Sequence, residues 1–194
     1  MVIGITGNSG AGKSVICGEL IKRIDDAVLI DADSIVKDMQ KEGESYYTEI
    51  VNTFGECILN KDRTINRKAL GDIVFSNREE KQKLDDLTRM YVVLEMNKKI
   101  EENVTRKYVL VDAPLLLEFN IDALCDITIF IDVDEEQKVD RICKRDGISK
   151  EAAKARISSQ NSAEVFTNRI DYVVVNDNLQ ETVNKILDII KIRA

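Results

Sequence analysis

Three glycines, a lysine and a serine stand close together near the start of the chain, at a spacing that suits phosphate binding. Residues 7–14 read G-N-S-G-A-G-K-S and match G-x-x-x-x-G-K-[ST]. An apolar run precedes them and an amphipathic run follows, as expected for a loop between a strand and a helix. Glycines let the backbone N–H groups of such a loop face one anion, and the helix N-terminus adds positive charge. The stretch therefore predicts a nucleoside triphosphate site.

Side chains of this loop have separate expected roles. We expect Lys13 to bridge the outer phosphates and Ser14 to ligate Mg²⁺. The residues predicted to bind ATP are Asn8, Ser9, Gly10, Ala11, Gly12, Lys13, Ser14 and Val15. The alternative, a glycine-rich turn without a ligand, is disfavoured because the pattern and its context agree.

Two aspartates follow the apolar run at 27–31, where a general base would be well placed. If the chain stays extended, alternation puts the side chains of Asp31 and Asp33 on one side. Because the chain contains no histidine, an aspartate is the natural base, and Asp33 is the candidate. The structural alternative is that Asp33 caps a helix beginning near Ser34, and both roles are compatible.

Asp112 ends another apolar run and is a candidate metal residue. In P-loop proteins an acidic residue at this place holds Mg²⁺ through its water shell. A polar strand end without a metal explains Asp112 equally well from the sequence alone. The leucines at 115–117 fit a core or a pocket wall better than chemistry.

Two short helices are predicted after the fourth apolar run. Asp134 and Gln137 form a variant of the capping box at the start of the first helix. Ser149 is placed to cap the second helix, two residues after Gly147.

These two helices carry arginines at helical spacing. Gln137, Arg141 and Arg145 recur every four residues and share one face, and Arg156 and Gln160 are also four apart. Such arginines would neutralise charge on a phosphoryl group in transit, while the helices close over the site as a lid. A solvated charged face would be the better explanation without the upstream loop.

Five short apolar runs are the predicted strands that would position these residues. They lie at 2–6, 27–31, 108–112, 127–133 and 172–175. Runs this apolar fit strands covered on both faces, which is typical of a parallel sheet. Amphipathic stripes between the runs predict helices, so the chain alternates β and α and belongs to the α/β class.

The segment from about 35 to 105 shows helical periodicity and no convincing strand. The apolar stripes expected to face a core are Tyr46, Ile50 and Phe54, and Leu84, Leu87, Tyr91 and Leu94. The segment is too long for a simple crossover, so we expect a helical subdomain.

Composition limits the class of protein. The chain has 194 residues and a formal net charge of −7, which fits one globular domain and disfavours a broad grip on nucleic acid. Four cysteines without a C-x-x-C pair, and the lack of histidine, disfavour zinc sites and disulfide scaffolds. No apolar run approaches the roughly 18 residues of a membrane span. We expect a reduced, cytoplasmic protein with neither nucleic acid nor membrane as a partner.

The ordered motifs resemble those of the dephospho-coenzyme A (dephospho-CoA) kinase family over nearly the whole chain. They are GITGNSGAGKS, IDADSIV, FGECILN with INRKALGDIVF, VDAPLLLE, RDGISKEAAKARISSQ and DYVVVN. The resemblance implies transfer of the ATP γ-phosphate to the ribose 3′-hydroxyl of dephospho-CoA, giving CoA and ADP. It also implies a P-loop NTPase fold, with a five-stranded parallel sheet flanked by helices, a helical substrate-binding insertion and a small helical lid.

The resemblance further implies a single kinase domain with three regions. The core would comprise about 1–34, 106–134 and 164–194, the acceptor-binding region about 35–105, and the lid about 135–163. The implied ligands are ATP, Mg²⁺ and dephospho-CoA, and the expected assembly is a monomer or a weak homo-oligomer.

Residue roles follow from motif position in the resemblance. The implied catalytic residues are Asp33 as base, Lys13, and Arg141 and Arg145 on the lid. Asn176, with Asp171, would lie near the ATP base, and Ser14 and Asp112 would serve the metal. The implied acceptor residues are Asp33, Arg67, Pro114, Leu115, Leu116 and Glu118.

Two departures from the family pattern fall on the acceptor side. The usual His-Pro dipeptide is absent from residues 84–90, where Arg89 is a candidate replacement, and the acid usual before Arg67 is Asn66. They leave open a kinase for another small acceptor, such as a nucleoside or nucleotide. A third hypothesis is a non-catalytic ATP-binding switch, for which loss of Lys13 or Asp33 would be expected; both are present.

Overall fold

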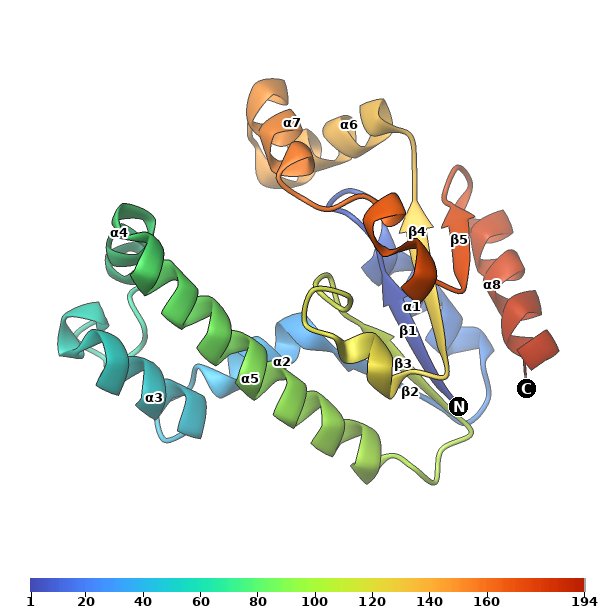
Figure 1. Ribbon diagram of the computed structural model, residues 1–194. Coiled ribbons are helices and arrows are strands. Elements are labelled where there is room, and N and C mark those ends of the chain that lie inside the picture. Colours follow the sequence, from blue (N-terminus) through green and yellow to red (C-terminus); the bar gives the residue numbers. More distant parts are fainter. Residues whose placement is uncertain (194) are drawn as a thin grey trace. The chain divides into compact units, whose positions relative to one another are not determined.

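The computed structural model describes residues 1–193 and contains a five-stranded parallel sheet (Figure 1). Its strands are β1 (Val2–Thr6), β2 (Ala27–Asp31), β3 (Tyr108–Asp112), β4 (Ile127–Asp132) and β5 (Tyr172–Val175), in the order β2-β3-β1-β4-β5. Central β1 aligns Ile3 with Leu110 of β3 and with Ile127 of β4. The predicted strands are confirmed, with β4 one residue shorter than the apolar run.

The strands are apolar because protein covers both faces of the sheet. One face carries α1 (Lys13–Arg23) and α8 (Leu179–Arg193), whose Leu20 and Ile186 belong to the same buried cluster as Ile5 of β1. On the other face, Leu116 and Cys125 fill the space above Gly4, where a Cβ would lie 2.8 Å from each side chain. All five residues of β3 are buried, as a strand covered on both faces requires.

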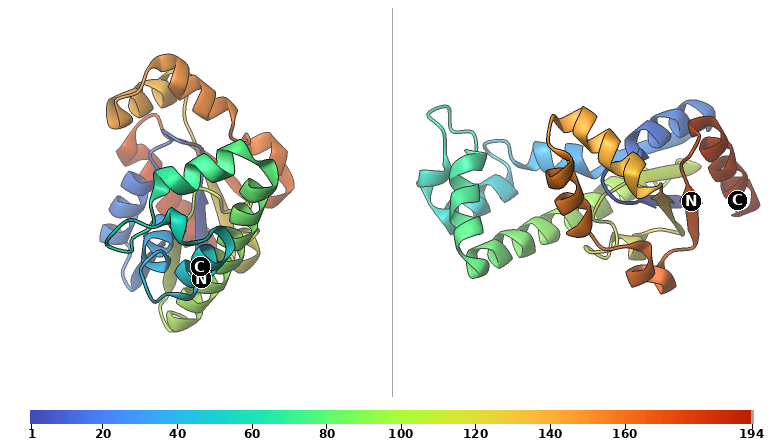
Figure 2. Two further views of the ribbon diagram at one scale, coloured as in Figure 1. Left: turned by 90° about the vertical axis from the view of Figure 1, so that its left-hand side faces the viewer. Right: turned by 90° about the horizontal axis from the view of Figure 1, so that it is seen from above.

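Helices α6 (Glu135–Asp146) and α7 (Lys150–Ser158) follow β4 and lie side by side in both views of Figure 2. Val139, Ile142 and Ala153 form their shared apolar contact. The predicted caps are confirmed: Asp134 accepts from the Glu136 N–H at 2.8 Å, and Ser149 Oγ accepts from the Ala152 N–H at 3.3 Å. Hydrophobic packing and two capped ends therefore define this helical pair.

The chain divides into two compact units. One comprises Met1–Ile30 and the chain from Ile100 onward, and therefore includes the sheet together with α6 and α7. The other is Asp31–Lys99, which holds most of the helical segment expected at about 35–105. Short 3₁₀ helices at Ile121–Leu124 (η2) and Ala163–Arg169 (η3) complete the first unit.

Four helices make up most of the second unit. They are α2 (Ala32–Met39), α3 (Ser45–Phe54), α4 (Arg67–Ser76) and α5 (Arg78–Glu102, whose last three residues belong to the first unit), with a 3₁₀ helix, η1, at Glu56–Ile58. Tyr46 of α3 packs its ring 5.5 Å from that of Tyr91 on α5, centroid to centroid. Its hydroxyl also lies 2.7 Å from the Thr88 hydroxyl. The aromatic stripe of α3 is thus buried as predicted.

The apolar stripe expected along α5 is partly wrong. Leu94 is 60% exposed, whereas Val92 and Met96 are buried. The two buried positions of this helix, Val92 and Met96, are four residues apart, and half-buried Thr88 lies four residues before Val92, whereas Leu94 is off this path. Residues three and four apart share a helix face, so the sequence permits both paths and packing selects one.

Asn66, one of the two departures from the family pattern, caps α4. Its Oδ1 accepts from the backbone N–H groups of Lys68 at 3.1 Å and Ala69 at 3.0 Å. Aspartate makes the same bonds at an N-cap and ranks equally there. The change from an acid to Asn66 therefore keeps the helix start intact.

We expect Asn66→Ala to lower the free energy of unfolding by about 1 kcal/mol, because two N–H groups lose their acceptor. Asn66→Asp should stay within a few tenths of a kcal/mol of the wild type, since the cap survives. Urea unfolding followed by circular dichroism measures both. If Asn66→Asp were as unstable as Asn66→Ala, the cap would not be the role of this residue.

None of the four cysteines, all within residues 1–193, forms a disulfide. Cys17 is buried and Cys57 is exposed, and burial raises the pKa of the Cys125 thiol to about 12. Cys125 is therefore protonated at neutral pH and packs as a small apolar group. Among the helices of residues 1–193, none combines the length and apolar character needed to cross a membrane.

Candidate active site

The loop between β1 and α1 has a backbone that requires glycine. Gly10 and Gly12 have φ angles of +83° and +89°, in the left-handed region. A Cβ on Gly10 would lie 2.8 Å from the Lys138 carbonyl oxygen, and one on Gly12 would lie 2.6 Å from Asn176 Nδ2. The glycines therefore let α6 and the chain after β5 approach the loop backbone closely.

Asn176 holds this loop from outside. Its Nδ2 donates to the Ala11 carbonyl at 2.7 Å, and its Oδ1 accepts from the Thr182 hydroxyl at 3.3 Å. The residue is 5% exposed. Asn176 therefore positions the loop, because its amide is buried and bonded to the loop and to Thr182. Its place near the ATP base stays a prediction.

Lys13 and Ser14 open α1 and reach two different groups. Lys13 Nζ donates to the Gly7 carbonyl at 2.6 Å. Ser14 Oγ donates to Asp112 Oδ2 at 2.9 Å, which joins the start of α1 to the end of β3. The structure thus brings together the two residues predicted to serve the metal, and Asp112 is only 5% exposed.

Arg141 lies against the same loop. Its guanidinium donates to the carbonyls of Gly10 at 3.2 Å and Asn176 at 3.3 Å, and to Gln137 Oε1 at 3.1 Å. Several carbonyl oxygens thus converge on one permanent cation, so Arg141 links α6, the loop and the end of β5. Gln137 and Arg141 lie on one face of α6, as the spacing predicted.

Arg145 is turned to a different partner, although it stands one helical turn further along α6. Its Nε and an Nη donate to the two carboxylate oxygens of Asp146 at 2.7 and 2.9 Å, and Arg156 of α7 contacts the same carboxylate. Hydrogen bonds from Arg145 and then Arg156 lower the Asp146 pKa to about 2, so the carboxylate is charged at neutral pH. Arg145 and Arg156 therefore converge on Asp146, whereas Arg141 contacts the glycine-rich loop.

The chain after α7 makes two contacts that its sequence does not indicate. Gln160 Oε1 accepts from the Ser9 N–H at 2.9 Å, and Asn161 Nδ2 donates to Glu118 Oε1 at 3.3 Å. Gln160 stood out only by its spacing from Arg156, and nothing in that spacing indicated the glycine-rich loop as its partner.

The segment after β3 divides between core and surface. Leu116 is fully buried above Gly4, whereas Leu115 is exposed and Pro114 and Glu118 are half-buried. The expectation that Leu116 contacts the acceptor is therefore corrected, because its side chain is enclosed in the core. Pro114, Leu115 and Glu118 remain candidates.

In the second unit, Asp31 rather than Asp33 caps α2. Asp31 Oδ1 accepts from the Asp33 N–H at 2.9 Å, and its Oδ2 accepts from Ser34 Oγ at 2.7 Å. Both the capping alternative for Asp33 and the expected alternation are wrong, since β2 ends at Asp31 and the helix begins at Ala32. Asp33 is exposed in the first turn of α2, with its carboxylate outside the cap.

Arg67 lies beside basic neighbours. It donates to Gln40 Oε1 at 3.3 Å and lines a pocket of about 480 Å³ with Lys37, Lys41 and Arg63. Two acids, Glu42 and Asp62, line the same pocket, so cations outnumber anions there. The other acceptor-side candidate, Arg89, pairs with Asp86 at 2.8 Å on the surface of α5.

Comparisons with known proteins agree with this geometry. The family model of dephospho-CoA kinase matches residues 1–181. A dephospho-CoA kinase from Fusobacterium nucleatum is 37% identical over 187 residues, which is 96% of this chain and 95% of the relative. The chain belongs to the dephospho-CoA kinase family. The prediction of an ATP-dependent dephospho-CoA kinase that uses ATP with Mg²⁺ is confirmed at this level.

Two further members of the dephospho-CoA kinase family extend the match. A relative from Carboxydothermus hydrogenoformans is 35% identical over 193 residues, covering 98% of this chain and 93% of its own. A solved dephospho-CoA kinase from Campylobacter jejuni is 27% identical, with a TM-score of 0.70 and coverage of 97% and 96% of the two chains. The P-loop kinase fold expected from the sequence is therefore confirmed.

Ser14 at the start of α1 and Asp112 at the end of β3 fit the magnesium that dephospho-CoA kinases use with ATP. Hydroxyl and carboxylate oxygens are the ligands that Mg²⁺ prefers. The Ser14 proton points to Asp112, which leaves the lone pairs of Ser14 Oγ available to an ion. Ser14 Oγ would thus bind the ion directly, and Asp112 would orient the Ser14 hydroxyl.

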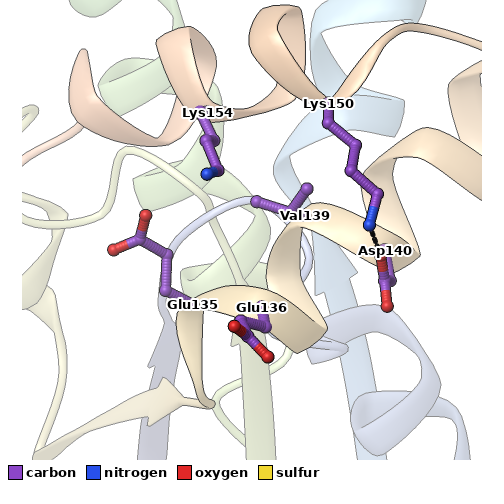
Figure 3. A pocket seen from close by; sticks show the side chains of 6 residues that line it. All are labelled: Glu135, Glu136, Val139, Asp140, Lys150 and Lys154. Atoms are coloured by element: carbon purple, nitrogen blue, oxygen red, sulfur yellow. Dashed lines mark ion pairs between the residues drawn. The ribbon is translucent and has the colours of Figure 1, made fainter.

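A cleft of about 440 Å³ lies between α6 and α7 (Figure 3). Acidic side chains of α6 face Lys150 and Lys154 of α7, and Lys150 pairs with Asp140 at 3.3 Å. Both members of this ion pair are well exposed, so it adds little to stability. None of the six lining residues was predicted to act in the kinase reaction, and we assign the cleft to helix packing.

Proposed function

We propose that this chain transfers the γ-phosphate of MgATP to the ribose 3′-hydroxyl of dephospho-CoA, with its glycine-rich loop as the donor site and Asp33 as the base. The observation that carries the proposal is the Ser14–Asp112 hydrogen bond of 2.9 Å, next to an intact loop. It joins the serine and the acid that P-loop enzymes use to hold the nucleotide's metal.

Donor-side residues have complementary roles in this proposal. Backbone N–H groups of residues 8–15 cradle the phosphates, and Lys13 places its charge beside the outer ones. Mg²⁺, when bound, neutralises charge on the transferred group. Asn176 and Arg141 act on the other side of the loop, where they hold its carbonyls and so keep the N–H groups aimed at the phosphates.

We expect Asp112→Asn to raise the Mg²⁺ concentration for half-maximal activity by about tenfold or more, because the charged partner of Ser14 becomes neutral. Initial rates of ADP release against free Mg²⁺ at fixed ATP measure this. Asp188→Asn, on the exposed surface of α8, removes the same charge and should leave the curve unchanged. An unshifted curve for Asp112→Asn would remove Asp112 from the metal site.

On the acceptor side, we propose that Asp33 takes the proton of the attacking hydroxyl. Its exposed carboxylate supports this role, since it is not committed to the helix cap. Arg67 and the basic pocket around it suit the phosphates of the acceptor. Pro114, Leu115 and Glu118 would complete the acceptor contacts.

The lid arginines complete the proposal. Arg141 is next to the donor loop and would neutralise charge during transfer. Arg145 would act in the same way once its guanidinium leaves the Asp146 carboxylate and binds a phosphate oxygen. Both groups are anionic hydrogen-bond acceptors. We also propose that the protein works in the cytoplasm as a monomer or weak homo-oligomer. Its four cysteines form no disulfide within residues 1–193, although Cys57 is exposed, which supports a reducing compartment.

The proposal is tested by ADP release from MgATP, with dephospho-CoA compared with a panel of nucleosides, nucleotides and no acceptor. Mass and phosphorus NMR spectra of the product identify the phosphorylated hydroxyl. We expect turnover on dephospho-CoA alone, at the 3′ position. Turnover only on another acceptor would mean that the changes at Asn66 and in residues 84–90 alter the substrate.

A further inference from the structure

The chain after α7 reaches back to the nucleotide-binding loop. Gln160 Oε1 lies 2.9 Å from the Ser9 backbone nitrogen, although 151 residues separate the two. Both residues are half-buried. A backbone N–H of the phosphate-binding loop is therefore bonded to a side chain of this same polypeptide.

In the donor site proposed above, Ser9 stands at the end of the loop that would face the outer phosphates. Lys13 reaches the β- and γ-phosphates in loops of this type. Its Nζ lies 2.6 Å from the Gly7 carbonyl, at the Gly7–Ser9 end. The N–H groups at the start of α1 lie at the opposite end, where the inner phosphates bind. The Ser9 N–H is thus placed for an oxygen that ATP has and ADP lacks.

Neighbouring bonds hold Gln160 in this place. Its own backbone N–H donates to the Ile157 carbonyl at 3.0 Å, which ties it to the last turn of α7. The next residue, Asn161, donates to Glu118 Oε1 at 3.3 Å. One bond from the Gln160 backbone and one from the Asn161 side chain thus hold Gln160 near Ser9.

We propose that Gln160 is a positioning residue that occupies the Ser9 N–H in place of the γ-phosphate, and that ATP displaces it whereas ADP does not. The inference rests on the donor site proposed above. A charged phosphate oxygen is a stronger hydrogen-bond acceptor than a neutral amide oxygen, so it wins the N–H. After transfer the γ-phosphate is gone, and Gln160 returns to Ser9. Gln160, at the end of the proposed lid, would therefore change its contact with Ser9 according to whether the γ-phosphate is present.

The first test is Gln160→Glu, with dissociation constants for AMP-PNP and ADP measured by calorimetry in the presence of Mg²⁺. The carboxylate is a stronger acceptor for the Ser9 N–H and repels the γ-phosphate. We expect AMP-PNP to bind about tenfold or more weakly, while ADP changes by less than about twofold. Ser159→Asp adds the same charge one residue earlier on an exposed position, and should leave the ratio of the two constants unchanged.

The second test follows the Ser9 amide directly by ¹⁵N NMR. In the wild type, we expect AMP-PNP to move the Ser9 resonance and ADP to leave it close to its ligand-free position. Gln160→Ala should move it in the ligand-free protein, because the N–H loses its acceptor. AMP-PNP should then bind at least as tightly as to the wild type, since no competitor remains.

Two results would overturn the inference while leaving the donor site in place: equal changes in AMP-PNP and ADP affinity for Gln160→Glu, or equal movement of the Ser9 resonance with both nucleotides. Failure of the wild type to bind either nucleotide would overturn the proposed donor site, and this inference with it. A role of Gln160 in folding alone would lower the melting temperature without changing the affinity ratio, and would count against the inference.

Discussion

We expect Lys13→Ala to lower kcat/KM for MgATP by at least about 100-fold, the effect of removing one preorganised charge that acts on a transferring group. Lys13 Nζ lies 2.6 Å from the Gly7 carbonyl, so the loop itself fixes the ammonium at the outer-phosphate end. Alanine cannot place any charge there. Because charge is redistributed among the outer phosphate oxygens during transfer, we expect kcat to fall more than ATP affinity.

Lys22→Ala is the matched control, because it removes the same charge from the same helix. Lys22 is an exposed residue that pairs with Glu19 at 2.7 Å, and such pairs contribute little. Steady-state rates for both variants, with melting temperatures, separate catalysis from folding. A folded Lys13→Ala protein within a few fold of wild-type turnover would contradict the role given to Lys13.

The sheet and the donor loop could be predicted because their signals are local. Strands buried on both faces must be largely apolar, so β1 and β3 stand out in the sequence as short apolar runs. The loop is also readable because Gly10 and Gly12 occupy backbone conformations that other residues rarely adopt. In the strands and in the loop, the local backbone or its burial restricts which residue types fit.

Features set by single residues or by distant partners could not be predicted. The start of α2 moved because Asp31, not Asp33, provides the cap, and both residues are good caps in isolation. Which path along α5 is buried depends on what packs against it, so Leu94 was misplaced. The bonds of Gln160 with Ser9 and of Asn176 with Ala11 join residues more than 100 positions apart, and no local pattern encodes them.

Asn66, on the acceptor side, departs from the pattern that the family resemblance implied, but the structure gives it an ordinary role as a helix cap. Asn66 replaces an acid of the family pattern, yet its Oδ1 accepts two N–H bonds at the start of α4 as an aspartate would. Shape and bonding are retained while one charge is lost. That change is therefore weak support for a different substrate.

Asp33→Asn is expected to lower kcat by about 100-fold to 10,000-fold, the range for loss of a general base. The amide keeps the shape of the side chain but cannot take the proton of the attacking hydroxyl. Because Asp33 is exposed and Asp31 caps the helix, the fold and its melting temperature should be unchanged. ATP binds at the glycine-rich loop in our proposal, so the dissociation constant for AMP-PNP should also be unchanged.

Asp31→Asn is the control that isolates the base, since it removes the same charge two residues earlier. Asparagine is as good an N-cap as aspartate, so α2 should keep its start and the enzyme most of its activity. Rapid-quench measurement of phosphoryl transfer at saturating dephospho-CoA separates the chemical step from product release for both variants. A fast chemical step in folded Asp33→Asn would mean that the acceptor hydroxyl loses its proton without Asp33. Catalysis would then depend on the charges around the transferred phosphate, with Lys13 foremost among them.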